Sequence, residues 1–394
     1  MMSASLGRGA TEGRMLQFPE SEMISLVSAA PRYDLAESLG PDLRLGELLQ
    51  PPAGQSGLGD LPLGYATAEG DLRLREALAR LHGVGPDDVV TTMGGMHALF
   101  LTAFILCGRD DEAVAVAPLF LPARNVLQAV GTRLRVLPLS FDRGYRLDLA
   151  AIGGLLTKQT RLVSLASPQN PSGVMIAPDT LRGLVRMMNE ICPEAFLLVD
   201  ETYRLAAFGD AIEAGPSALA LSDKVISAAS LSKCHGAPGL RLGWAITRNI
   251  QLRKRLVLGK FNTVISCSPV DEALALRVFE DSDRIIAERR KLRTDGLAIS
   301  AEWVGENSRF VGWVRPDAGA ICCVRLKREM FDDAAVGRFH ATLASQGVRV
   351  ADGTWFGDEA RVFRLGFGLL PIPELQSALR LLSDALRQTS RVAA

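Results

Sequence analysis

The chain has 394 residues, which suffices for one large domain and a smaller one, and its 44 basic and 44 acidic side chains form no run of one sign. This balance excludes the basic surface that nucleic acids and anionic membranes require, and six cysteines without C-x-x-C spacing, with four dispersed histidines, exclude a structural zinc site or a disulfide framework. Residues 1–15 lack the apolar core of a signal peptide and no run of about 18 apolar residues occurs, so we expect a soluble cytoplasmic protein whose partner is a small molecule.

The amino-terminal part is weakly patterned. We predict a flexible tail over residues 1–15, then an arm over residues 16–50 that joins the small domain and carries a short helix at 21–30. Residues 51–64 are rich in glycine and proline, which indicates a loop.

Short apolar runs then alternate with helical patterns, and together they predict a large domain over residues 51–290. Strands are predicted at 89–92, 113–117, 134–139, 162–166, 196–199, 225–229 and 242–247, and helices at 71–81, 96–106, 122–130 and 179–191. Apolar runs of this length between helices are typical of strands buried on both faces, so the fold class is α/β with a mostly parallel central sheet flanked by helices.

The remainder of the chain predicts a smaller α+β domain over residues 291–394, completed by the amino-terminal arm. A long charged helical stretch at 269–300 is expected to cross between the domains. Strands follow at 310–314, 320–326 and 362–367, and a helix at 374–387.

Polar residues follow several of the predicted strands, where open α/β sheets bind their ligands. Lys233 follows the apolar run 225–229, and burial there favours a neutral amine that can form a Schiff base. Ser230 and Arg241 are donors that could hold a phosphate, and Gly94 and Gly95 open a helix whose first N–H groups could do the same.

This combination, which includes Asn170-Pro-Ser-Gly and Asp200-Glu-Thr-Tyr203, resembles the class I/II aminotransferases, fold type I enzymes that use pyridoxal 5′-phosphate (PLP). The resemblance implies that Lys233 forms the internal aldimine and then serves as the base for proton transfer. It implies that Asp200 faces the ring nitrogen and that Tyr203 and Asn170 hydrogen-bond the phenolic oxygen.

The resemblance also assigns the remaining cofactor contacts. Ser230, Arg241 and the backbone of Gly94, Gly95 and Met96 would hold the phosphate, and no metal is implied. Phe120 would stack on the pyridine ring, although an ordinary core aromatic remains an alternative for it. Tyr65 matches a tyrosine that reaches the phosphate of the neighbouring subunit, which implies a homodimer with shared active sites.

Substrate binding is assigned in the same way. Arg364 matches the small-domain arginine that binds the substrate α-carboxylate, with Asn170 and Gly40 as further contacts. Arg361 is the nearest rival of Arg364, and Asp200 taken alone could be only a helix N-cap.

The sequence therefore predicts an aminotransferase of amino acid metabolism that moves an amino group between an α-amino acid and a 2-oxo acid. A PLP-dependent lyase, cyclase or oxidase would use the same residues, and a non-catalytic PLP-binding regulatory protein is a more distant alternative. The residues do not identify the donor or the acceptor.

Overall fold

The structure is a computed structural model that describes residues 18–19, 22–23, 31–38, 40–49, 58–209 and 217–391. The predicted tail, most of the helix predicted at 21–30 and part of the loop predicted at 51–64 lie outside these residues. None of the helices in the described ranges is both long and apolar enough to cross a membrane.

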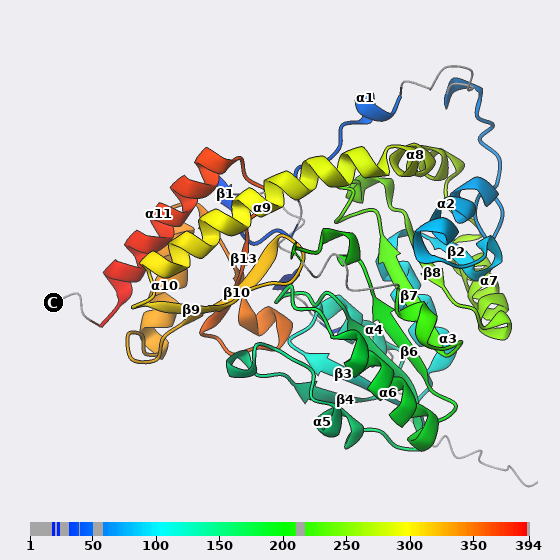
Figure 1. The fold of residues 1–394 in the computed structure, drawn as a ribbon, viewed down its shortest axis with the longest axis horizontal. Helices are drawn as coiled ribbons and strands as arrows, with labels where there is room; N and C mark the ends of the chain where they lie inside the picture. Colours follow the sequence, from blue (N-terminus) through cyan, green and yellow to red (C-terminus); the bar gives the residue numbers. More distant parts are fainter. Residues whose placement is uncertain are drawn as a thin grey trace, which may run out of the picture.

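A seven-stranded sheet forms the centre of the larger part of the molecule (Figure 1). Its strands, in spatial order, are β2 (Val89–Thr92), β8 (Gly243–Ile246), β7 (Val225–Ser230), β6 (Phe196–Asp200), β5 (Thr160–Ala166), β3 (Glu112–Ala117) and β4 (Arg133–Pro138). Only β8 runs antiparallel to its neighbours β2 and β7, and the other pairs are parallel. The predicted α/β class and its mostly parallel sheet are confirmed.

Helices cover both faces of this sheet and bury its apolar side chains. They are α2 (Leu72–His82), α3 (Gly94–Leu106), α4 (Leu121–Ala129), α5 (Leu149–Gly153), α6 (Pro178–Ile191), α7 (Ile250–Val264) and α8 (Pro269–Glu280). Helices α5 and α6 pack on one face, and α3, α4 and α7 pack on the other. Because both faces are buried, nearly every residue of β3 and β7 is apolar or small.

The smaller part is an α+β unit built from both ends of the chain. Its four-stranded antiparallel sheet has the order β12 (Ala351–Asp352), β13 (Val362–Gly366), β10 (Ile321–Leu326) and β9 (Val311–Val314), and it packs with α10 (Asp333–Ser345) and α11 (Ile372–Thr389). From the amino-terminal side, β1 (Tyr33–Asp34) pairs with β11 (Val348–Arg349), and the Leu35 carbonyl accepts a hydrogen bond from the Gly366 N–H at 2.7 Å. The short helix α1 (Leu45–Leu48) follows.

The long helix α9 (Ser282–Glu306) joins the two parts (Figure 1). The helical stretch predicted at 269–300 is therefore two helices, because the chain turns at Asp281 between α8 and α9. The predicted domain boundary at residues 290 and 291 falls inside α9.

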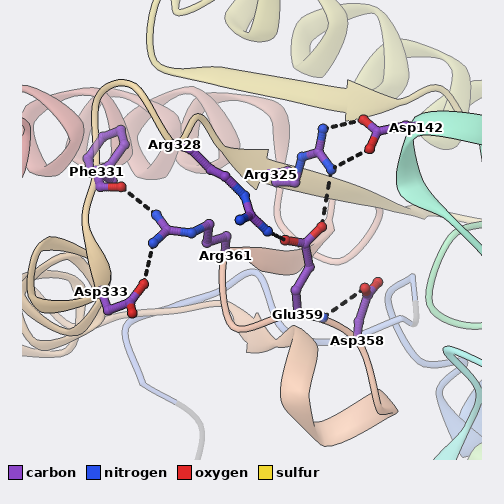
Figure 2. A network of polar contacts seen from close by, with 8 residues as sticks. All are labelled: Asp142, Arg325, Arg328, Phe331, Asp333, Asp358, Glu359 and Arg361. Carbon is purple, nitrogen blue, oxygen red and sulfur yellow. Dashed lines mark hydrogen bonds and ion pairs between the residues drawn. The ribbon is translucent and has the colours of Figure 1, made fainter.

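Ion pairs also join the two parts, as Figure 2 shows. Arg325 on β10 lies between Asp142, which belongs to the larger part, and Glu359, at 3.1 Å, while Arg328 contacts the other oxygen of Glu359 at 3.2 Å. Arg325 is mostly buried, so these contacts help to fix the angle between the sheets.

Candidate active site

Lys233 lies just beyond the carboxyl end of β7, in the interior of the larger part near the smaller one. Burial lowers the pKa of Lys233 to about 8, while the nearby Glu37 carboxylate opposes this shift and Arg364 supports it. A lysine with this pKa is still mostly protonated at physiological pH, but its neutral fraction is far larger than that of an ordinary lysine, and the neutral amine is the form that acts as a nucleophile or a proton acceptor.

Asp200 and Tyr203 approach from the neighbouring strand. Asp200 ends β6, beside Ala228 of β7, and its carboxylate accepts a hydrogen bond from the Thr202 N–H at 3.0 Å. Burial raises the pKa of Asp200, because loss of solvent disfavours the charged carboxylate unless a positive group lies beside it. The Tyr203 hydroxyl is buried and has no hydrogen-bond partner among the described residues, although Ser38 lies near enough to lower its pKa.

The predicted phosphate residues come together at the first turn of α3. Gly94 has φ +73°, and a Cβ there would lie 2.5 Å from the Arg241 guanidinium, so only glycine allows this arginine to approach the helix end. A Cβ on Gly95 would meet Ser230 at 3.6 Å. Backbone N–H groups, a hydroxyl and a guanidinium thus converge on one point, as anion sites require.

Arg364 and Asn170 meet across the boundary between the two parts. Arg364 is 1% exposed and donates to the Asn170 Oδ1 at 2.7 Å and to the Ala36 carbonyl, while its guanidinium lies 4.8 Å from the Phe356 ring centroid. The Nε atom of Arg364 has no hydrogen-bond partner in the described ranges. Arg361, by contrast, turns to the Phe331 carbonyl and to Asp333 (Figure 2).

Three further predicted residues, Gly40, Phe120 and Tyr65, lie at the edge of the site or outside it. Gly40 lines the cavity that contains Lys233 and Tyr203. Phe120 is half-buried and packs against a cluster that contains Ala36 and Phe356. Tyr65 is 84% exposed in this single chain, so a role at a phosphate would need a second subunit.

The sequence interpretation missed Arg289 and Arg293, which α9 places in the same cavity as Lys233. Charged residues on a long helix usually face solvent, and nothing in their spacing distinguishes these two from the exposed Arg290. Only the packing of α9 against the two parts shows where they point.

Comparisons with known proteins support the same assignment. The family model described as "Aminotransferase class I and II" matches residues 53–380. The chain belongs to the class I/II aminotransferase family. Capreomycidine synthase of Streptomyces vinaceus is 32% identical over 82% of this chain and 80% of its own length.

Two further relatives differ in what their names describe. Arginine–pyruvate transaminase of Pseudomonas aeruginosa is 26% identical over 80% of this chain and 81% of its own length. The solved structure of the PLP-dependent cyclase OrfR is 26% identical, with a TM-score of 0.80 over 96% of this chain and 99% of that one. The relatives of this family member therefore include a transaminase, a synthase and a cyclase.

The cofactor of this family member is PLP, and the site fits it. The unpartnered Tyr203 hydroxyl can bind a phenolic oxygen, and the desolvated Asp200 carboxylate can bind a protonated ring nitrogen. The cradle at the start of α3 can hold a phosphate, and Lys233 supplies the amine.

Proposed function

We propose that this enzyme is an aminotransferase that moves the amino group of an α-amino acid to a 2-oxo acid. The observation that supports it most directly is the convergence of Lys233, whose pKa is lowered to about 8, with the buried pair Arg364 and Asn170. An α-carboxylate held at Arg364 would bring the substrate Cα toward the lysine amine.

The proposed roles follow from the chemistry of each group. PLP supplies the electron sink for the pair left when Cα loses its proton. Arg364 orients the substrate carboxylate through its planar fork of donors, and Lys233 Nζ takes the Cα proton and returns it. Tyr203 and Asp200 position the ring through their polar atoms, while Ser230, Arg241 and the first N–H groups of α3 bind the phosphate.

Cyclisation of an amino acid is the second candidate, and the similarity to capreomycidine synthase and OrfR favours it. It would use the same proton removal at Cα, so the site residues named above are common to both functions. The names of the relatives make arginine a first amino acid to test as donor or substrate.

One experiment separates the two candidates. The purified enzyme is incubated with arginine and with a panel of other amino acids, with and without pyruvate or 2-oxoglutarate, and the products are identified by mass spectrometry. Transamination predicts that product forms only with an acceptor, which becomes an amino acid. Product that forms at the same rate without acceptor would refute transamination and support cyclisation or elimination. Lys233→Ala should abolish either reaction.

A homodimer with shared sites is part of the proposal. Exposed apolar side chains on α3 and α7, among them Phe104, Leu258 and Phe261, lie on the larger part that also carries Tyr65. Mixing inactive Lys233→Ala chains with weakened Tyr65→Phe chains would create hybrid dimers with one native site. If the mixture is more active than the sum of the two variants measured separately, the active sites are shared between subunits. If its activity only equals that sum, shared sites are refuted.

A further inference from the structure

The cavity beside Lys233 is strongly basic. Tyr203 and Lys233 form one side, Arg289 and Arg293 of α9 form another, and the backbone of Gly40 contributes to the rest. Of the residues that the structure describes, three basic side chains and no acidic side chain line it. A cavity of this composition attracts an anion.

Within the part of the chain that the structure describes, Arg293 has a buried charge without a counter-ion. It is 6% exposed, and its Nε and one of its Nη atoms are buried without a hydrogen-bond partner among the described residues. The ionisable neighbours that influence its pKa are the Cys234 thiol and two further arginines, Arg289 and Arg290. Burying an unpaired guanidinium costs several kcal/mol, so proteins normally supply it with an anion.

Arg284, on the same helix, has the carboxylate partners that Arg293 lacks. It contacts Asp281 at 3.0 Å and Glu288 at 3.1 Å, although it is half-exposed and its charge is therefore better solvated. Arg293, the most buried arginine of α9, thus lacks a carboxylate partner among the described residues.

The backbone around Arg289 accommodates its guanidinium closely. A Cβ on Gly236 would lie 1.5 Å from an Nη atom of Arg289, and a Cβ on Gly40 would lie 2.8 Å from the other. Arg289 also donates to the Pro41 carbonyl. A side chain at Gly236 or Gly40 would displace Arg289, so glycine at both positions leaves the guanidinium room beside the cavity.

We propose that Arg293 and Arg289 form an anion subsite beside Lys233, which binds a carboxylate or similar oxyanion group distinct from the α-carboxylate and the cofactor phosphate. Those two anions already have separate donors, namely Arg364 with Asn170, and Arg241 with the start of α3. The group comes either from the far end of a substrate or from a free anion, and the first case rests on the proposed function.

Thermal unfolding of the holoenzyme tests the subsite without requiring turnover. Succinate and acetate are titrated at constant ionic strength into the wild type, Arg293→Met and the control Arg290→Met, whose arginine is exposed on the same helix. We expect a saturable rise in Tm of about 2 °C at ten times the dissociation constant in the wild type and in Arg290→Met, and none in Arg293→Met. Without added anion, Arg293→Met should unfold no earlier than the wild type, because the unpaired charge is gone.

Three results would overturn the subsite: no saturable rise in the wild type, an equal rise in Arg293→Met, or early unfolding of Arg293→Met without anion. The last result would show that Arg293 is a structural anchor. Failure of the enzyme to transaminate would refute the proposed function but would leave this measurement decisive.

Steady-state kinetics identify the source of the anion. If the group belongs to a substrate, Arg293→Met should raise KM at least tenfold for glutamate or 2-oxoglutarate and leave KM for alanine or pyruvate unchanged. If the anion is free, the variant should leave all KM values unchanged while abolishing the effect of succinate on Tm. Equal increases of KM for every substrate would contradict both sources.

Discussion

Replacement of Arg364 gives the sharpest test of how the site recognises its substrate. Arg364 is almost fully buried, and it reaches Asn170 from the other part of the molecule. A carboxylate bound to its guanidinium would form two charge-assisted hydrogen bonds, each contributing about 1.5–3 kcal/mol. Arg364→Gln should therefore weaken transition-state binding by about 3–6 kcal/mol, which is about 100- to 10,000-fold in kcat/KM.

Arg361→Gln is the matched control, since it removes the same group three residues earlier. Arg361 contacts the partly exposed surface at Asp333 and the Phe331 carbonyl (Figure 2), so its loss should leave kcat/KM within about threefold. The assay is kcat/KM for the amino acid that gives the fastest turnover, with cofactor content verified by absorbance. Equal losses in both variants, or a loss below tenfold in Arg364→Gln, would refute the assignment of the α-carboxylate to Arg364.

Three further predictions concern the cofactor cradle, the lysine and the boundary between the two parts. Gly94→Ala should weaken PLP binding at least tenfold, because its Cβ would lie 2.5 Å from Arg241 and the backbone there has a positive φ. The control is Gly239→Ala in the Arg241 loop, where an added Cβ would lie within 4 Å of no described atom, so its Kd for PLP should be unchanged. Both Kd values are measured by absorbance titration. In cofactor-free protein the pKa of Lys233 is lowered from 10.5 to about 8, so between these pH values the unfolded chain binds more protons than the folded one. The free energy of unfolding of the wild type, measured in urea, should therefore rise relative to that of Lys233→Met by up to about 3 kcal/mol from pH 8 to 10.5. A difference between the two proteins that stays constant over this range would contradict the pKa shift. Asp142→Asn removes one partner of Arg325 and should lower the free energy of unfolding slightly at low salt and less at high salt, whereas Asp179→Asn, in a more exposed pair, should have a smaller effect still.

The large sheet could be predicted from the sequence because most of its strands are buried on both faces, the edge strand β4 excepted. Runs such as Ala113–Ala117 are apolar throughout, and a run of this length fits a buried strand, whereas most helices are longer. Polar residues at strand ends then indicated Lys233, Asp200 and Asn170, since parallel strands end at one edge of a sheet.

Other features depended on tertiary packing. Helix α7 has no clear apolar face, because it exposes Leu258 and Phe261 and buries Lys260 completely, and it was not predicted. Arg293 could not be distinguished from Arg290 before the course of α9 was known. The family pattern favoured Arg364 over Arg361, and the structure shows why the two differ: Arg364 is buried against Asn170, whereas Arg361 turns to Asp333.

The central claim is that Lys233 is the lysine that binds the cofactor and carries the proton. The most direct test is borohydride reduction of the purified holoenzyme, followed by digestion and mass spectrometry of the lysine-containing peptides. The visible absorbance band should bleach, and the reduced pyridoxyl group should be found on Lys233 alone and be absent from Lys233→Ala. A colourless protein that takes up no PLP, or a label on another lysine such as the fully buried Lys260, would contradict the claim.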